Sequence, residues 1–457
     1  MASIPGSQFN AAAGAQPVNV VTSSDGSNLP PPVPGQFNLE VITGNTIPPL
    51  APGYQGLAII GPGGNPITLV TGAFEIQDTA TGGAIDTITA LGDNETISAG
   101  PGNNDFLIAD GNNDVIIGGG QDFITVNGNN DTVNGVGNDF IQINGDHAVI
   151  NGGSGNDTIL AYAGSDGDTI NATTGTDLVI TWGNNESITG GPGNDTILAL
   201  SGNNDTIVGG GGSELIGVWG ANATVAGGGG NDTILAIQGS HGDTINAQTG
   251  NDIVYVLDTG NTVVGGSGND TIGLYAGNNA FFGQTGTYNI QAIGDHETVE
   301  GGGGHGNILA VGSSDTIVAG VGGNDTILAV GNNNTIAGSV STSPQITAYG
   351  NNNTIQLGGH NEAVTVGGSG NQVFAGGGQD TVDMLYGTTT FNDGANQYAD
   401  TVIGFNQAAG DRIHLTGGHT VATTTQVNGG QDTLITLSDS STILLKGVTS
   451  VNNSFFS

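Results

Sequence analysis

Residues 152–159 read Gly-Gly-Ser-Gly-Asn-Asp-Thr-Ile, and nearly the same eight residues return at 190–197, 227–234 and 265–272. Between Asp86 and Asp380 an acidic or amide residue recurs every nine or ten positions, usually followed by Thr and then by Ile or Val. A short fixed period is typical of stacked, nearly identical units. The pattern therefore predicts a solenoid and not a conventional globular core.

The recurring acid falls in two kinds of turn. A first series has glycine two residues before the acid, as in Gly155 and Asp157, and a second series has glycine three residues before it, as in Gly128 and Asp131. Each series recurs at about 18 or 19 residues, and the two interleave. This spacing predicts a coil of about 18 residues with two short strands and two turns, so that each turn type lines one edge.

The residues after each acid fit a strand of such a coil. Because side chains alternate along a strand, the Thr of Asn-Asp-Thr-Ile is expected to point outward and the Ile inward. Stacked Ile and Val would then form a thin continuous core, and glycine in the turns would supply positive φ at little steric cost. The expected fold is an all-β, parallel β-roll or β-solenoid.

Composition narrows the possible partners. The chain has 457 residues with 86 Gly, no Cys, and a formal net charge of −38, and Arg412 and Lys446 are the only basic residues. Nucleic acid and anionic membranes are poor partners for such a chain, and disulfides and thiol catalysis are excluded. No apolar run approaches a membrane span, and the N-terminus shows no basic, apolar signal sequence. Forty carboxylates need neutralisation, for which a divalent cation is the expected agent.

The glycine-rich stretches resemble the nonapeptide Gly-Gly-x-Gly-x-Asp-x-apolar-x of the RTX (haemolysin-type calcium-binding) family. The resemblance implies a right-handed parallel β-roll with several Ca²⁺ ions held between successive turns. Glycine-rich turns offer bare carbonyls beside a carboxylate, and Ca²⁺ prefers six to eight such oxygens. The metal ligands implied are Gly153, Gly155, Asp157, Gly175, Asp177, Gly191, Gly193, Asp195, Gly212, Glu214, Gly228, Gly230, Asp232, Gly250, Asp252, Gly266, Gly268, Asp270, Gly323 and Asp325.

The second turn series departs from the family pattern. Its turns read Gly-Asn-Asn-Asp, Asn334 and Asn353 replace the acid, and alanine is expected to replace it at three further turns. Stacked Asn side chains can hydrogen-bond along a solenoid without metal, and this interpretation is favoured over calcium on that edge. In the first series the acid is absent at three places, and metal is expected to be missing there. The three alanines are Ala148, Ala223 and Ala280, and the three thin places are Tyr288, Asn307 and Gln345.

The two ends of the chain differ from the repeats. Residues 398–405, 410–415 and 432–437 resemble the element that closes many RTX rolls, which implies a C-terminal cap with a type I secretion signal at 383–457. The repeats occupy 84–382. Residues 1–83 are rich in Pro and Gly, and are expected to form an arm and cap or a segment that docks on a neighbouring subunit by strand addition.

The outward faces offer two further patterns. Three residues after acids of the first series stand Leu160, Ile180, Leu198, Leu235, Tyr255 and Leu328, which are expected to form an apolar stripe suited to lateral contact. The other face carries Thr96, Thr132, Thr169, Thr206, Thr244, Thr262, Thr316, Thr335 and Thr354, similar to RTX ice-binding modules.

No zinc-protease or serine-hydrolase motif is placed for catalysis. The expected function is therefore a non-enzymatic, secreted, calcium-dependent structural protein that self-assembles at the bacterial cell surface or in the extracellular matrix as an S-layer, fibre or biofilm scaffold. Its partners would be further copies of itself and cell-surface polysaccharide. The alternatives are a monomeric adhesin or ice binder, and an exoenzyme acting on polysaccharide.

Overall fold

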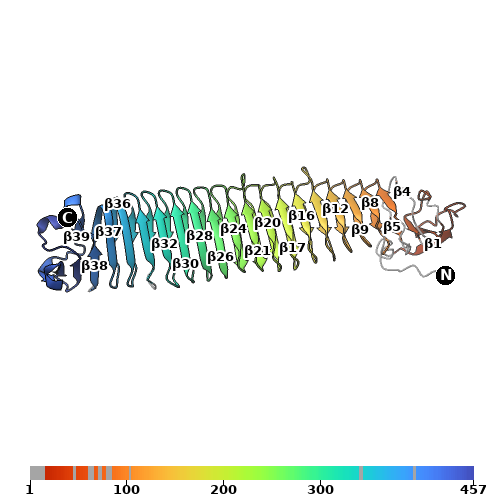
Figure 1. Ribbon diagram of the computed structural model, residues 1–457. Helices are drawn as coiled ribbons and strands as arrows, with labels where there is room; N and C mark the ends of the chain where they lie inside the picture. The colour runs from red at the N-terminus through yellow and green to blue at the C-terminus, as the bar shows by residue number, and fades with distance from the viewer. Residues whose placement is uncertain are drawn as a thin grey trace. The chain divides into compact units, whose positions relative to one another are not determined.

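The computed structural model describes residues 16–44, 48–59, 66–69, 75–78, 85–101, 104–338, 343–394 and 398–457. These residues form 42 strands and three short 3-10 helices (Figure 1). Strands pair in parallel with the equivalent strand one coil away, except in the C-terminal region, where the last three strands run antiparallel. The prediction of an all-β parallel solenoid is confirmed.

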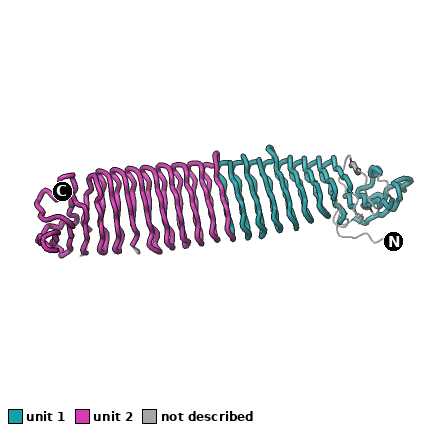
Figure 2. The backbone as a smooth tube through the Cα atoms, viewed as in Figure 1, with its two compact units in different colours: residues 1–228 teal, residues 229–457 magenta. Residues whose placement is uncertain are grey.

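The chain divides into two compact units, residues 1–228 and 229–457 (Figure 2). In each unit a coil contributes one strand to face A and one to face B. We call the turns that lead into face A strands the first edge, and the turns that lead into face B strands the second edge. The two predicted turn series lie on these two edges.

Unit 1 begins with face B strands alone and then alternates. Its face A strands are β4 (Pro66–Leu69), β6 (Thr87–Ala90), β8 (Phe106–Ala109), β10 (Phe123–Val126), β12 (Phe140–Ile143), β14 (Thr158–Ala161), β16 (Leu178–Thr181), β18 (Thr196–Ala199) and β20 (Leu215–Val218). Its face B strands are β1 (Val18–Ser23), β2 (Phe37–Ile42), β3 (Gly56–Ile59), β5 (Glu75–Asp78), β7 (Thr96–Ser98), β9 (Val115–Ile117), β11 (Thr132–Asn134), β13 (Val149–Asn151), β15 (Thr169–Asn171), β17 (Ser187–Gly191), β19 (Thr206–Gly210) and β21 (Thr224–Gly229), which ends one residue into unit 2.

Unit 2 continues the same alternation. Its face A strands are β22 (Thr233–Ala236), β24 (Ile253–Val256), β26 (Asn269–Leu274), β28 (Thr287–Ile293), β30 (Gly306–Val311), β32 (Thr326–Val330) and β34 (Gln345–Tyr349). Its face B strands are β23 (Thr244–Thr249), β25 (Thr262–Val264), β27 (Ala280–Phe282), β29 (Thr298–Glu300), β31 (Thr316–Val318), β33 (Thr335–Ala337) and β35 (Thr354–Gln356). The long strands β36 (Ala363–Phe374) and β37 (Thr381–Asn392) each serve both faces, because β36 pairs with β34 at one end and with β35 at the other.

Alternation of inward and outward side chains along most short strands builds the core. In β14 the burial runs half-buried, buried, half-buried, buried, with Ile159 and Ala161 fully inside. Ile170 of the facing strand β15 is equally buried. The expected inward Ile and outward Thr are therefore confirmed, and in these coils the core is a stack of aliphatic side chains between the two faces.

The N-terminal strands extend face B beyond the repeats. β1 pairs with β2, β2 with β3, and β3 with β5, all in parallel. β2 is buried along its whole length, since its outer side is covered by the loops that follow β1 and β2. Tyr54 donates its hydroxyl to Pro30 O at 2.9 Å, and Asn38 Nδ2 donates to Val33 O at 3.1 Å. Residues 1–15 and the expected boundary at 83 and 84 lie outside the described residues.

The C-terminal residues leave the coil pattern. β38 (Ala399–Ile403) pairs in parallel with β42 (Thr442–Leu445), while β40 (Val421–Val427), β41 (Asp432–Leu437) and β42 run antiparallel. β39 (Arg412–His414) and the 3-10 helices at Gln407–Ala409, Asn428–Gly430 and Asn453–Phe455 complete the region. Residues 382 and 383, where the sequence predicts its start, both lie within β37.

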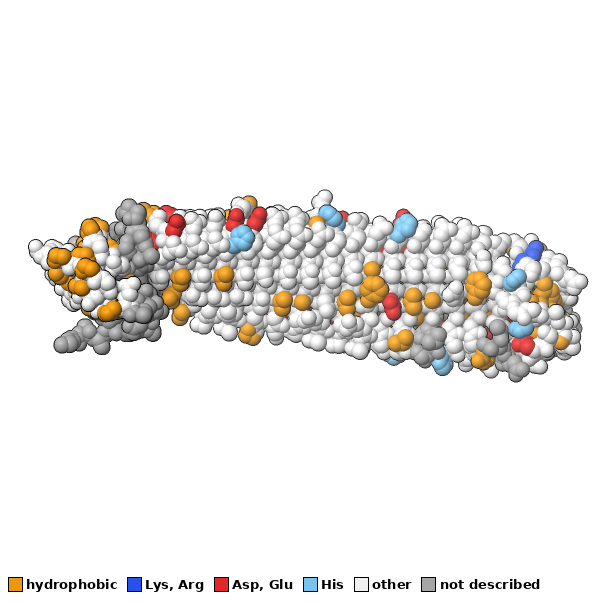
Figure 3. All heavy atoms as spheres, turned by 180° about the vertical axis from the view of Figure 1, so that it is seen from behind, with side chains coloured by type: hydrophobic (Ala, Val, Ile, Leu, Met, Phe, Trp, Pro, Cys, Tyr) orange, Lys and Arg blue, Asp and Glu red, His pale blue; other side chains and the backbone are white. Residues whose placement is uncertain are grey.

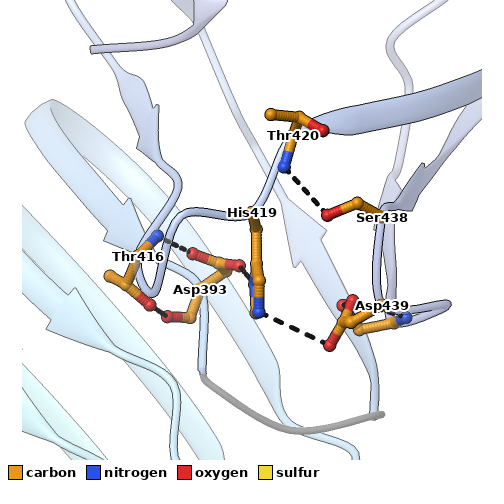
Figure 4. A network of polar contacts seen from close by, with 7 residues as sticks. Asp393, Thr416, His419, Thr420, Ser438 and Asp439 are labelled. Carbon is orange, nitrogen blue, oxygen red and sulfur yellow. Dashed lines mark hydrogen bonds and ion pairs between the residues drawn. The ribbon is translucent and has the colours of Figure 1, made fainter.

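A polar cluster ties three segments of this region together (Figure 4). His419 Nδ1 lies 2.7 Å from Asp393 Oδ2, and its Nε2 lies 3.6 Å from Asp439 Oδ2. Thr416 also donates to Asp393, through its backbone N–H and its hydroxyl. A histidine that faces a carboxylate with each ring nitrogen can donate to both only when it is protonated.

The outward residues follow the predicted faces. The six residues of the expected apolar stripe on face A are all half-buried. The residue that follows each of them in the chain, such as Ala161 after Leu160, points inward and is buried. The face seen in Figure 3 shows hydrophobic side chains in a broken row among uncharged ones. Few acidic side chains are visible there although the chain has 40 Asp and Glu, because many carboxylates are buried at the edges.

Candidate metal centres at the two edges

The first edge carries a ladder of buried carboxylates, one at the same position of successive coils. Each acid stands immediately before a face A strand, as Asp157 does before β14 and Asp177 before β16. The backbone N–H of Asp157 donates to Asp177 Oδ1 at 2.7 Å, and that of Asp177 donates to Asp195 Oδ1 at 2.9 Å. All three side chains are 2% exposed. One oxygen of each carboxylate is thus fixed by the preceding coil.

The other oxygen of these carboxylates is buried without a hydrogen-bond partner. This holds for Oδ2 of Asp139, Asp157, Asp177 and Asp195 in unit 1 and of Asp252 and Asp270 in unit 2. Burying an ionised oxygen with no donor or cation is costly. In these turns the arrangement therefore calls for a proton or a metal ion.

A space that only glycine leaves open lies next to this oxygen. A Cβ atom on Gly152 would stand 2.5 Å from Asp157 Oδ2 and 2.8 Å from Ala172 O of the next coil. A Cβ on Gly190 would stand 2.7 Å from Asp195 Oδ2 and would collide with Gly209 O. The first glycine of the motif therefore keeps clear a gap between a carboxylate oxygen and a backbone carbonyl, and both are ligands that Ca²⁺ prefers.

The later glycine of the turn is needed because successive turns stack closely. A Cβ on Gly175 would collide with Gly155 O, and both glycines have positive φ, 149° and 129°. L-residues rarely adopt such a conformation. The expectation that glycine supplies positive φ is confirmed for ten of the predicted ligand positions, namely Gly153, Gly155, Gly175, Gly191, Gly228, Gly230, Gly250, Gly266, Gly268 and Gly323.

The predicted acids all occupy the ladder position of the first edge, but they are not equivalent. Glu214 accepts from Gly212 N at 2.9 Å in its own turn. Asp325 accepts from Gly306 N and Gly320 N, each at 2.6 Å, so both of its oxygens are already bonded. The complete set lies at no more than 2% exposure: Asp157, Asp177, Asp195, Glu214, Asp232, Asp252, Asp270 and Asp325.

The electrostatics agree with this geometry. Burial raises the pKa of Asp157 and Asp177 to about 6 and that of Asp139 to about 7, and neighbouring carboxylates of the ladder add to the effect. The charged forms are therefore disfavoured until an opposite charge is supplied.

A cluster of three carboxylates in unit 1 was missed by sequence reasoning. The ligand oxygens of Asp78, Asp86 and Asp105 lie within 4.8 Å of one another, and all three residues are buried. Asp86 and Asp105 belong to the first-edge ladder, whereas Asp78 ends β5. Gln77 pairs with Ser98 and Ser98 with Ile117, so the same register continued by one residue aligns Asp78 with Ala99 and Gly118. The sequence could have indicated this cluster, because Asp78 is acidic where the equivalent residues of the next coils are Ala99 and Gly118. Hard oxygen donors in this number suit a divalent cation.

Tyr288 replaces the carboxylate in one coil of unit 2. It pairs with Asp270 in register, and its hydroxyl donates to Gly266 O at 2.7 Å and accepts from Gln284 N at 2.8 Å and Gly286 N at 3.2 Å. The ring is 1% exposed. The carbonyl of Gly266, a predicted ligand, is thus engaged by a phenol. The ladder residue in the following coil is Gly306 and not Asn307, because Gly306 pairs with Tyr288.

The second edge carries asparagine ladders, as the sequence predicts. Asn112 Oδ1 accepts from Asn129 N at 3.0 Å, and Asn184 Oδ1 accepts from Asn203 N at 3.1 Å. Positive φ in these turns comes from asparagine, as at Asn130 (61°), and His147 and His296 adopt the same conformation. The prediction that Ala280 removes the ladder residue is wrong: Asn279 holds the position, accepting from Asn261 N at 2.8 Å, and Ala280 begins β27.

The fold and these edges define a parallel β-roll of the calcium-binding type. Segments 78–104, 143–167, 162–197, 220–236, 237–272 and 255–289 match the RTX calcium-binding nonapeptide repeat. Repeats of this type therefore occur in both units of the chain. No curated protein matches it significantly. Within the described residues, no helix combines the length and apolar character required to cross a membrane.

Proposed function

We propose that this RTX-repeat chain is a secreted, non-enzymatic structural protein that folds on binding calcium and assembles with copies of itself at the cell surface or in the extracellular matrix. The observation that carries the calcium part is the row of buried carboxylate oxygens without hydrogen-bond partners, facing turn carbonyls across gaps kept open by glycine. The repeats and the solenoid support a calcium-binding structural role.

Calcium would act through charge. At low calcium the carboxylates of successive coils repel one another and resist burial, which favours an unfolded, exportable chain. At roughly 0.1 to 1 mM, the range of weak extracellular calcium modules, the ion would neutralise the turns and its binding free energy would become folding free energy. The first-edge aspartates and the turn carbonyls would hold it. Export through a C-terminal signal is part of the proposal.

Assembly would use face A. Leu160, Ile180 and Leu198 lie in consecutive register on β14, β16 and β18 and are half-buried. In a chain of net charge −38, an uncharged apolar row is a place where two copies can meet with little repulsion. A sheet, a fibre or a biofilm scaffold would each follow from such lateral contacts, with surface polysaccharide as a further partner.

Electron microscopy of the purified chain tests this proposal directly. Ordered sheets or filaments are expected in millimolar calcium and not in EGTA. The triple variant Leu160→Ser, Ile180→Ser and Leu198→Ser should bind calcium but assemble poorly. A matched triple on face B, Thr169→Ser, Thr206→Ser and Thr224→Ser, should assemble normally. Dispersed particles in calcium would overturn self-assembly.

One rival function has an observation in its favour. On face B of unit 1, Thr169, Ser187, Thr206 and Thr224 stand in consecutive register. A flat hydroxyl row of this kind suits a binding protein that acts without assembly, including an ice binder. Thermal hysteresis of the calcium-loaded chain, abolished by Thr206→Leu, would favour that function.

A further inference from the structure

The second edge places acids in some coils and asparagines in others at one ladder position. In both cases the side-chain Oδ1 accepts a backbone N–H from the preceding coil. Asp114 N donates to Asp131 Oδ1 at 2.7 Å in unit 1, and Asp315 N donates to Asn334 Oδ1 at 2.9 Å in unit 2. The two residue types therefore differ only at the second terminal atom, which is Nδ2 in asparagine and Oδ2 in aspartate.

In the asparagine coils the second atom is satisfied within the chain. Asn334 Nδ2 donates to Gly312 O at 3.1 Å, Asn353 Nδ2 to Gly331 O at 3.0 Å, and Asn371 Nδ2 to Gly350 O at 3.0 Å. The acceptor is each time the turn glycine of the preceding coil. Both halves of the buried amide are thus hydrogen-bonded, and the turn carbonyl has its donor.

In the acidic coils the second atom occupies the same place but cannot donate. A Cβ atom on Gly331 would stand 3.2 Å from Asn334 Nδ2 and would collide with Gly312 O. A Cβ on Gly128 would stand 3.0 Å from Asp131 Oδ2 and would collide with Gly111 O, and one on Gly312 would stand 3.2 Å from Asp315 Oδ2 and would collide with Gly294 O. Asp131 and Asp315 are at most 1% exposed, and Oδ2 of each has no hydrogen-bond partner.

A carboxylate oxygen and a carbonyl oxygen therefore face each other where the asparagine coils have an N–H donor between them. Two acceptors in that position can be satisfied by a proton on the carboxyl group or by a cation between them. We propose that Asp131 and Asp315 each help to hold a divalent cation on the second edge, outside the Gly-x-Asp spacing of the nonapeptide, and that Asn334, Asn353 and Asn371 make their own turns independent of metal. Calcium is the ion named because the inference rests on the proposed function, and hard oxygen donors suit it.

Reciprocal exchange of the two residue types tests the inference. Asp131→Asn is expected to reduce bound calcium by about one ion per chain, counted by equilibrium dialysis, and to raise the melting temperature in EGTA, because its new amide can donate to Gly111 O. Asn334→Asp is expected to add about one ion, and to lower the melting temperature in EGTA while calcium restores it. If Asn334→Asp does not fold in EGTA, the Asp131→Asn variant still tests the inference. It is expected to be more stable in EGTA than the unaltered chain, so both its ion count and its melting temperature can be measured.

A first-edge variant separates this inference from the calcium role as a whole. Asp157→Asn removes a nonapeptide carboxylate and should also lower the ion count. A lower count for Asp157→Asn with an unchanged count and unchanged EGTA stability for Asp131→Asn would overturn the second-edge sites alone. If the unaltered chain bound no calcium, the proposed function and the inference would fail together.

Discussion

Tyr288 occupies a ladder position at which other coils have a carboxylate, and its side chain bonds the backbone groups of the turn directly. Its hydroxyl contacts one carbonyl and two N–H groups from two neighbouring turns, and its ring packs edge-on against Phe281 with centroids 5.1 Å apart. Gly265 and Gly302 lie so close to the ring that a Cβ on either would collide with it. Hydrogen bonds and packing of this one side chain therefore hold the turn.

Tyr288→Phe is expected to destabilise the protein equally with and without calcium. The change removes the hydroxyl that accepts from Gln284 N and from the buried Gly286 N and that donates to Gly266 O, and a buried donor left without a partner costs about 1–3 kcal/mol. Chemical unfolding in EGTA and in calcium measures the loss. Tyr275→Phe is the matched control, since Tyr275 is exposed and its hydroxyl reaches only Gln291, at 3.3 Å. A loss confined to calcium would show that this coil depends on metal after all.

At the scale of elements, the short strands and the turns follow from the sequence. A period of nine or ten residues with one inward aliphatic residue leaves almost no other way to bury side chains, so β14 or β16 could be predicted nearly residue by residue. The strands β1 and β2 could not, because residues 18–42 contain no repeat, and their place depends on stacking against β3.

The residues of the candidate metal sites could be predicted from the sequence, but their bonding could not. Its aspartates and glycines are visible in the motif, but which carboxylate oxygen is bonded depends on contacts one coil away. Asp78 looked like an ordinary acid of the N-terminal segment, and only the pairing of β5 with β7 places it beside Asp86 and Asp105. Similarly, the role of Asn334 Nδ2 depends on a carbonyl 22 residues earlier.

The cluster around His419 makes one C-terminal element sensitive to pH. The hydrogen bond to Asp393, with the charges of Asp393 and Asp439, raises the pKa of His419. A raised histidine pKa means that the stabilisation is fully present below about pH 6.5, the ordinary value, and is lost as pH rises through the higher folded pKa.

His419→Gln should therefore increase amide hydrogen exchange in β39 to β42 most strongly at acidic pH. Relative to the unaltered chain, the difference should shrink as pH rises. His360→Gln is the control, because His360 is exposed in a first-edge turn, between β35 and β36. An equal difference at every pH would contradict the protonated bridge.

At the scale of the whole molecule, burial of so many carboxylates should make calcium and protons compete. In the folded chain the pKa of Asp157 and Asp177 is about 6 and that of Asp139 about 7, compared with about 3.9 in an unfolded chain. Between these values the folded state holds more protons than the unfolded state, so the free energy of unfolding falls as pH rises.

The melting temperature in EGTA is thus expected to fall from pH 4.5 to 7.5. Millimolar calcium should replace the protons and reduce or abolish this fall, whereas magnesium, which demands a stricter octahedral geometry, should do so less. Scanning calorimetry at several pH values measures this. A melting temperature that rises with pH in EGTA would show that the carboxylates are satisfied in some other way.

The ladders also run in one direction. On the first edge the ladder N–H groups donate to carboxylates that come later in the chain, as Asp157 N does to Asp177 Oδ1 in unit 1 and Asp380 N does to Asp400 Oδ1, at 3.1 Å, in unit 2. On the second edge Thr389 N likewise donates to Asp411 Oδ1 at 2.8 Å. In a chain that folds from its N-terminus, the ladder N–H of each newest coil would lack its acceptor until the next coil had folded. Folding would then proceed coil by coil toward the C-terminus, and Asp400 and Asp411 would supply the last acceptors of the two ladders.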